Sequence, residues 1–329
     1  MLKISTSPHL QTPRDTRSLM RDVVIALLPA ALAAVAFFGI EALTVILTSV
    51  AACVMFEYLV CRYWFKIPNT TGDYSAVITG LLLAYNLPSS MPCWMILIGA
   101  FVAIVITKMC FGGLGCNIFN PALAGRVFLF ISFPVQMTNW PLPHWGSLFA
   151  PDGRTGATTL RMLKTFGKVS DGAQQMYTLD DLPNLFDMFI GNTGGCIGEI
   201  SALALLLGGG WLIFRKVITW HIPVVYISTV VALVGILYVF TGNERFLPLP
   251  HLLSGGLLLG AIFMATDYTT SPMTIKGQLI FAVGCGVLTV VIRAFSAYPE
   301  GVSFAILIMN ALVPLIDRYA VQRFYGEKK

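Results

Sequence analysis

Long apolar runs separated by short polar connections dominate this chain of 329 residues. A helix needs roughly 20 apolar residues to cross about 30 Å of hydrocarbon, and fewer where it is broken or surrounded by protein. About ten runs fit this description: 23–40, 42–61, 74–87, 93–109, 121–135, 196–214, 222–241, 250–265, 278–293 and 303–316. The pattern predicts an all-α polytopic membrane protein. Its third, fifth and last runs are short and should form half-length or tilted helices.

Composition excludes a soluble domain. Hydrophobic residues make up 56% of the chain, charged residues only 11%, and the mean hydropathy is +0.77. Such a chain places most of its backbone in lipid. Arg14, Arg17 and Arg21 precede the first run, and no small-residue cleavage pattern follows it. We therefore expect the first run to be a retained span and not a signal peptide.

The basic residues predict the orientation of the spans. With the N-terminus in the cytoplasm, the outer side receives six of the 21 Lys and Arg residues, namely Arg154, Arg161, Lys164, Lys168, Arg245 and Arg293. Positively charged connections are retained in the cytoplasm. We therefore expect both termini inside and the long polar stretch 136–183 on the outer face.

Parts of the sequence recur in the second half. Residues 79–84 resemble 255–260, and 98–108 resemble 283–293, with Lys108 parallel to Arg293. Asn120 in the first half parallels Asn310 in the second. The third and eighth runs are five spans apart, so the halves should have opposite orientations, as in inverted-repeat proteins. The organisation expected is a cytoplasmic segment (1–22), a first five-helix repeat (23–135), an extracytoplasmic segment (136–195), a second repeat (196–318) and a cytoplasmic tail (319–329).

The glycine-rich stretch 112–122 is the least helical one at membrane depth. Glycines allow close backbone approach, and Pro121 can start a helix whose first N–H groups point at a ligand. A cofactor near Asn117 and Asn120 is one interpretation, and a plain cytoplasmic turn is the other. Cys110 and Cys116 flank this stretch, but two thiolates do not complete an iron–sulfur site, so small hydrophobic roles are favoured. No cysteine lies in the outer polar stretch, which argues against a disulfide framework.

Ionisable residues in apolar runs are costly and are candidates for function. The acidic ones within or beside the runs are Glu57, Asp73, Glu199, Asp267 and Asp317. Helix ends can explain the three aspartates. Glu57 can pair with Arg62, five residues on, and an ion-pathway role stays open for Glu57 and Glu199. The histidines, His9, His144, His221 and His251, have no metal-ligand spacing, so no metal site is expected.

One motif stands in the long polar stretch. Residues 152–158 read Asp-Gly-Arg-Thr-Gly-Ala-Thr. This resembles the target of the flavin transferase that links flavin mononucleotide (FMN) by a phosphoester to the final threonine, here Thr158. Asp152, Thr155, Gly156 and Ala157 supply the rest of the motif, and Thr155 replaces a frequent serine while keeping the hydroxyl. The other interpretation is a Gly/Thr turn before an amphipathic stretch.

The wider chain resembles one family. The ten runs, the motif after the fifth, Phe-Gly-Gly-Leu-Gly-Cys-Asn-Ile-Phe-Asn-Pro-Ala at 111–122 and Met-Ala-Thr-Asp-Tyr-Thr-Thr-Ser-Pro at 264–272 carry the resemblance. The family comprises RnfD, a membrane component of the Rnf ferredoxin:NAD oxidoreductase complex, and its relative NqrB, a component of the sodium-pumping NADH:quinone oxidoreductase. The length of the chain resembles the Rnf component more.

This resemblance implies an electron-carrier subunit of a translocase in the bacterial cytoplasmic (inner) membrane, with covalent FMN on Thr158 at the outer face. The complex would couple ferredoxin and NAD to Na⁺ or H⁺ movement, the flavin supplying the redox chemistry and the protein its position. A non-covalent riboflavin near Asn117 and Asn120 is a further expectation, because the quinone-reductase relative holds one. The implied partners are RnfA, RnfB, RnfC, RnfE and RnfG, the flavin transferase during maturation and membrane lipid, with no nucleic acid. No complete active site is expected in this chain alone.

Two other functions are compatible with the sequence. Inverted repeats with broken helices are common in solute channels and transporters, and the family also resembles the urea-transporter fold. Fold does not decide function. A transporter needs no attachment threonine, and a purely structural anchor for redox partners would tolerate the loss of Thr158.

The charge distribution gives a testable topology. In a cysteine-free background, a cysteine at Gly172 should react with a membrane-impermeant reagent applied outside the cell, and one at Lys329 should not. Equal labelling of both sites would contradict the ten-span arrangement.

Overall fold

The computed structural model describes residues 15–66, 70–143, 155–165, 181–199, 201–296 and 300–320. Within these ranges the chain is helical, apart from one pair of two-residue strands and the connections. The all-α fold class expected from the apolar runs is confirmed, and each of the ten runs contains a helix.

The first half of the chain forms one very long bent helix followed by shorter ones. Its elements are α1 (Thr16–Leu59), the π-helix η1 (Val60–Phe65), the 3-10 turn η2 (Thr71–Asp73), α2 (Ser75–Tyr85), α3 (Cys93–Phe101), the π-helix η3 (Val102–Met109), α4 (Pro121–Ser132) and α5 (Pro134–Met137). Gly39 has φ 64°, a conformation that favours glycine, and it interrupts α1. The first two predicted spans therefore follow one another through a kink.

Small elements precede the second half. These are β1 (Trp140–Pro141), β2 (Thr155–Gly156), α6 (Thr159–Thr165) and α7 (Leu185–Ile190). The two strands pair antiparallel, with Trp140 opposite Gly156.

The second half again combines long helices with a broken one. Its elements are α8 (Ala202–Phe214), α9 (His221–Thr241), the 3-10 turn η5 (Glu244–Phe246), α10 (Pro248–Leu253), α11 (Leu257–Leu259), the π-helix η6 (Gly260–Met264), α12 (Ile275–Phe295) and α13 (Val302–Tyr319).

Three of the expected span lengths were wrong. The last run was expected to be short, but α13 has 18 residues. The eighth run is broken between α10 and α11, because Gly255 and Gly256 have φ values of 72° and 63°. The sixth run becomes helical only at Ala202, so α8 has 13 residues. As expected, α2 and α4 are short, with 11 and 12 residues.

Four helices are long and apolar enough to cross a membrane on their own: Thr16–Phe65, His221–Thr241, Ile275–Phe295 and Val302–Tyr319. The shorter apolar helices are Ser75–Tyr85, Cys93–Met109, Pro121–Ser132 and Ala202–Phe214. Half-length helices at membrane depth require neighbouring protein to satisfy their backbone ends. The short helices therefore belong in the interior, with long ones around them.

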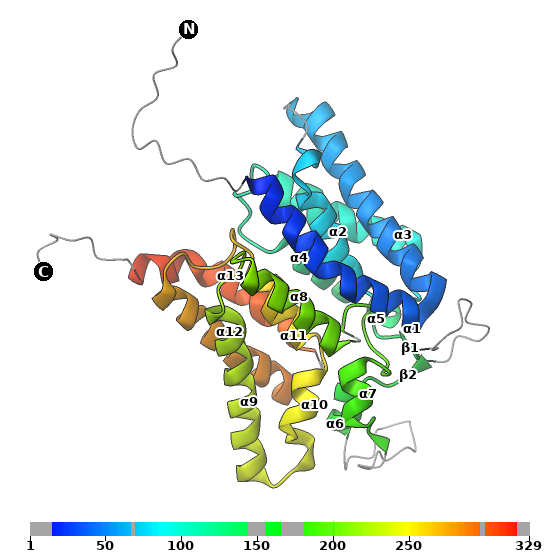
Figure 1. Ribbon diagram of the computed structural model, residues 1–329, viewed down its shortest axis with the longest axis vertical. Helices are drawn as coiled ribbons and strands as arrows, with labels where there is room; N and C mark the ends of the chain where they lie inside the picture. The colour runs from blue at the N-terminus through cyan, green and yellow to red at the C-terminus, as the bar shows by residue number, and fades with distance from the viewer. Residues whose placement is uncertain are drawn as a thin grey trace, which may run out of the picture.

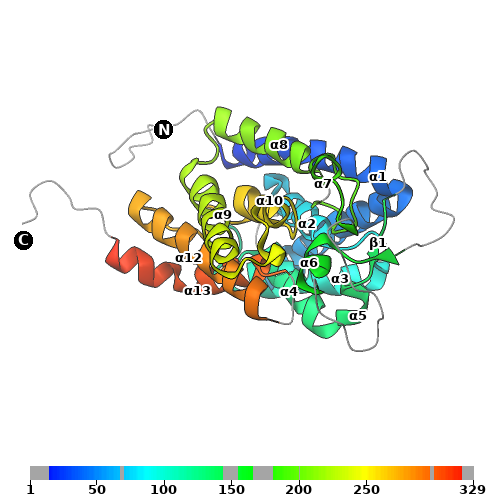
Figure 2. The ribbon, with the colours of Figure 1, turned by 90° about the horizontal axis from the view of Figure 1, so that it is seen from below.

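The arrangement agrees with this requirement. In Figure 1, α1 to α4 occupy one side of the molecule and α9, α12 and α13 the other, while α6, α7 and the strands gather at one end. Figure 2 shows α8 alongside α1. Helix α1 packs on α2, α3 and α8, and α12 packs on α9 and α13. Nearly all of α2 is buried, from Ser75 to Tyr85.

Glycines allow the closest helix contacts. A Cβ on Gly80 of α2 would lie 2.7 Å from Val50 Cα of α1, and Ser49 Oγ donates a 2.8 Å hydrogen bond to Gly80 O across the same contact. Gly208 of α8 lies similarly against the backbone of Ala26. Small residues that bring backbones together are the usual device for packing helices in membranes.

This contact predicts the effect of added bulk. Gly80→Ala should destabilise the protein by about 1–3 kcal/mol, because the new methyl group meets backbone atoms that cannot rotate away. Thermal unfolding of the purified protein in detergent measures the change. The matched control is Gly210→Ala in α8, where a Cβ meets nothing within 4 Å. The packing argument fails if Gly80→Ala unfolds at the same temperature as the control.

Candidate functional site

The described part of the FMN motif leads into α6. Thr155 and Gly156 form β2 beside β1, and a Cβ on Gly156 would lie 2.7 Å from Leu142 Cδ2. Thr158 stands immediately before α6 and its Oγ1 accepts a 3.3 Å hydrogen bond from the Arg161 N–H. This is the contact of an N-cap residue. Asp152 lies outside the described residues.

The attachment threonine is not on an exposed loop, contrary to our expectation from the polar character of the stretch. Thr158 is only 5% exposed and Thr159 4%, whereas Thr155 is exposed. The reason is that α6 is amphipathic and buries Leu160 and Leu163. The cap of α6 is buried together with its first turn.

A pocket lies on the side of the molecule that bears the glycine-rich turn. It encloses about 760 Å³, including its open mouth, between α1, α2, α4, α8 and the segment after η6. Its polar lining comprises Ser75, Thr79, Lys108, Asn117, Asn120, Thr266, Asp267 and Thr269. Its apolar lining includes Leu82, Leu212 and Phe263. Mostly apolar pockets with a few polar groups are typical of cofactor sites.

Asn117 and Asn120 both line this pocket, as the cofactor interpretation of their stretch requires. Their amides also hold the local structure. Asn120 Oδ1 accepts from the N–H groups of Ala122 (3.1 Å) and Leu123 (3.4 Å), and its Nδ2 donates to Met264 O (3.2 Å). The first N–H groups of α4 are therefore capped by Asn120, although we expected them to face a ligand. Asn117 Nδ2 donates to Phe119 O (3.1 Å).

A buried ion pair borders the pocket. Lys108 Nζ lies 2.6 Å from Glu57 Oε2 and donates to Ser75 Oγ at 2.7 Å, while Thr70 Oγ1 donates to Glu57 Oε1 at 2.7 Å. Both charged side chains are at most 3% exposed. The expected pairing of Glu57 with Arg62 was wrong. Glu57 faces the core, and a residue distant in the sequence supplies its partner.

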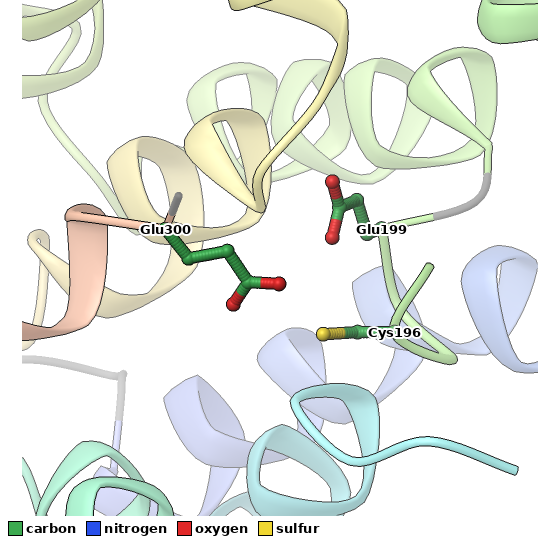
Figure 3. Close-up of side chains that lie close together, drawn as sticks. All are labelled: Cys196, Glu199 and Glu300. Atoms are coloured by element: carbon green, nitrogen blue, oxygen red, sulfur yellow. The ribbon is translucent and has the colours of Figure 1, made fainter. Parts of the chain in front are cut away.

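A second buried network lies between the two halves. Arg126 of α4 pairs with Glu300, and its NH1 donates to Asn86 Oδ1 (2.8 Å) and Ser303 Oγ (2.7 Å). Cys196 Sγ accepts from Arg126 NH2 at 3.5 Å. Figure 3 shows Glu199 and Glu300 pointing toward one another, with Cys196 beside them.

Sequence reasoning missed this network. Arg126 was counted only as a topological charge near the cytoplasmic side, whereas it is 5% exposed in the core. An arginine inside an apolar run was itself the available signal. Glu300 carried no such signal, because it stands in a connection between helices.

The two halves share one feature that the repeat predicted and differ in another. Lys108 near the end of η3 reaches Ser75 at the start of α2. Arg293 near the end of α12 reaches the segment before α11, donating to His251 O (2.6 Å) and Ser254 O (3.1 Å). Each basic residue thus anchors the short helix of its own half.

The parallel between Asn120 and Asn310 was wrong. Asn120 precedes α4, whereas Asn310 is in the middle of α13, and the corresponding N-cap of α13 is Gly301. The two asparagines instead meet in space. With its amide oriented to satisfy both neighbours, Asn310 accepts from Asn120 N (3.2 Å) and donates to Thr270 O (3.1 Å).

All seven cysteines are free. Cys110 and Cys116 are exposed on the turn after η3, which does not suit the small hydrophobic role favoured from the sequence. The sulfur of Cys196 and carboxylate oxygens of Glu199 and Glu300 lie within 4.8 Å of one another. The guanidinium of Arg126 on Glu300 opposes a metal cation there.

The fold and these sites define a multi-pass helical membrane protein with a cofactor-sized pocket and buried charges between its halves. Comparison with known proteins then assigns its family. A model of the NQR2, RnfD and RnfE family matches residues 3–326, and the chain belongs to this family. The resemblance inferred from the sequence motifs is confirmed.

Full-length relatives agree, and all three described here are RnfD components of their complexes. The chain is 44% identical over 332 residues to that of the Na⁺-translocating ferredoxin:NAD⁺ oxidoreductase complex of Acetobacterium woodii, covering 100% of this chain and 96% of the relative. It is 46% identical to that of the proton-translocating ferredoxin:NAD⁺ oxidoreductase complex of Clostridium ljungdahlii, covering 99% and 96%. It is 43% identical to that of the ion-translocating oxidoreductase complex of Stutzerimonas stutzeri, covering 94% and 91%.

The Lys108–Glu57 pair yields a stability prediction. Lys108→Met should cost about 3–5 kcal/mol, because it leaves the Glu57 carboxylate buried without its cation. The double variant Glu57→Gln/Lys108→Met should regain most of that loss, since both charges are gone. Thermal unfolding in detergent measures all three proteins. Additive losses in the double variant would show that the two side chains do not act as a pair.

Proposed function

We propose that this chain is the membrane electron-carrier component, RnfD, of an ion-translocating ferredoxin:NAD oxidoreductase complex, with FMN covalently bound to Thr158. Three relatives at 43–46% identity are the corresponding components of such complexes. The observation that carries the flavin proposal is the match of 152–158 to the transferase target, with Thr158 at the start of a helix.

The surroundings of Thr158 fit a phosphoester. The free N–H groups of a first helical turn favour a negative charge, and the Thr158 hydroxyl stands at that end of α6. Arg161 lies in the same turn. The bound flavin would accept and donate electrons. The chain's own part is to hold its phosphate at a defined place beside the membrane core.

Burial of Thr158 adds a requirement for maturation. A hydroxyl on a residue that is 5% exposed cannot be reached by another enzyme, so the 155–158 segment must leave its place for attachment. Little holds β2 there, because it is a two-residue strand on one neighbour. The transferase would act before the segment settles or during its opening.

The pocket lined by Asn117 and Asn120 supports a second, non-covalent flavin. Its size is within the range of cofactor pockets, about 300–1,000 Å³. Lys108, Thr266 and Asp267 supply donors and an acceptor around an apolar interior. We propose riboflavin as its occupant, with Asn117 and Asn120 as wall residues that hold the pocket's shape.

The partners proposed are the other Rnf components, RnfA, RnfB, RnfC, RnfE and RnfG, with the flavin transferase during maturation. The proposed location is the bacterial inner membrane, with the FMN segment on its outer face. One relative's name gives Na⁺ as the translocated ion and another's gives a proton. The coupling ion is therefore left out of the proposal.

Two variants at one position test the attachment. Thr158→Ala removes the hydroxyl and the cap of α6, which costs about 0.5–2 kcal/mol. Thr158→Asn removes the hydroxyl but keeps a side chain that caps as well as threonine does. The complex is made together with the flavin transferase. Mass spectrometry should find FMN on the wild-type peptide and on neither variant, and ferredoxin-dependent NAD reduction should collapse in both.

Thr159→Ala is the matched control, because it alters an equally buried neighbour and keeps the attachment hydroxyl. It should keep both FMN and activity. An unmodified Thr158 peptide in an active wild-type complex would refute the attachment. A solute transporter or a passive anchor predicts equal behaviour of all four proteins. Acid extraction of Thr158→Asn should still release riboflavin if the pocket holds it.

A further inference from the structure

The network between the halves contains more carboxylate than it has partners for. Glu300 is paired with Arg126, and all of the contacts made by Arg126 go to Glu300, Cys196, Asn86 and Ser303. None of them goes to Glu199. Arg293, the other nearby cation, gives its terminal nitrogens to the carbonyl groups of His251, Ser254 and Gly255.

Glu199 therefore has one partner only. Its Oε1 accepts from the backbone N–H of Gly255, while its Oε2 is buried without a hydrogen-bond partner among the described residues. An ionised carboxylate left in this state is costly, since neither water nor a donor compensates its charge.

The backbone holds Glu199 in this position. The connection before α8 is tied to the end of α2 by the bonds Ile197 N to Leu87 O (3.1 Å) and Gly198 N to Tyr85 O (2.8 Å). A side chain at Gly198 would collide with Tyr85. Glu199 cannot withdraw to water without breaking these contacts.

Two like charges would also repel one another here. Oxygens of Glu199 and Glu300 and the sulfur of Cys196 are mutually within 4.8 Å. Carboxylates this close share a proton when water is excluded, because both cannot stay ionised at an acceptable cost. A proton on Glu199 would turn its orphan oxygen into a donor toward Glu300.

We propose that Glu199 and Glu300 form a proton-binding site in the core of the protein, with one proton held by Glu199 and directed at the carboxylate of Glu300. The titratable and charged groups around it are Cys196, Arg126 from α4 and Arg293 from α12. Arg126 keeps Glu300 ionised and repels a metal cation, so the site selects a proton. The proposal does not depend on a bound flavin.

The site is placed to respond to the motif segment. Gly255, whose N–H binds Glu199, is touched by Leu160 of α6, and a Cβ there would collide with it. Any displacement of α6 must therefore move the one donor that holds Glu199. Gain or loss of the proton is thereby linked mechanically to the segment that begins at Thr158.

Infrared difference spectroscopy of the assembled complex, titrated with pH in sodium-free buffer, tests the site. A protonated carboxylic acid has a C=O stretching band that a carboxylate lacks. We expect one such band in the wild type, its loss in Glu199→Gln and its shift in Glu300→Gln, where the acid keeps its proton but loses its acceptor. Glu41→Gln is the control, because Glu41 is exposed on α1.

Glu199→Asp keeps the acid and serves if the Gln variant does not assemble; its band should shift and not vanish. A band that is unchanged in the Glu199 variants, or absent from the wild type, would overturn the proposal. So would a band abolished by adding NaCl at constant pH, since that result would identify a site for a metal cation. The flavin content of each sample is measured separately, so a failed FMN proposal is distinguishable from a failed proton site.

Discussion

The guanidinium of Arg126 is the contact on which the junction between the two halves depends. It joins the end of α2 through Asn86, the start of α13 through Ser303, and the connections that carry Cys196 and Glu300. A buried cation is costly unless it is paired and its donors are satisfied. The surrounding segments are held where they can meet that requirement, which makes the position of α4 a condition for the whole interior.

Broken helices create the same demand in the backbone. The ends of α2, α4 and α11 lie in the interior, where no water reaches their free N–H and C=O groups. Side chains replace the missing water. Asn120 caps α4, Lys108 binds the first residue of α2, and Arg293 binds the carbonyl groups ahead of α11. Polar residues in the apolar runs are thus partly structural, which explains why they cluster at helix ends.

Polar interiors of this kind also create sites. The break that ends η3 and begins α4 opens the pocket near Asn117, and the break before α11 exposes the N–H that Glu199 uses. The two sites lie at different breaks and have different chemistry. The first is an apolar pocket with a polar wall, as a planar cofactor requires. The second is a pair of carboxylates without room for more than a proton.

The sequence alone determined the number of helical runs, the family and the position of the attachment motif, because these depend on local hydrophobicity and on residues adjacent in the chain. It also identified the parallel between Lys108 and Arg293. Only the tertiary structure decided which charges meet: Glu57 with Lys108 and not Arg62, and Arg126 with Glu300. It also showed Thr158 buried at a helix cap. Pairings between residues 51 and 174 positions apart leave no local pattern, since the cost of burying a charge is offset by whatever partner the packing brings near.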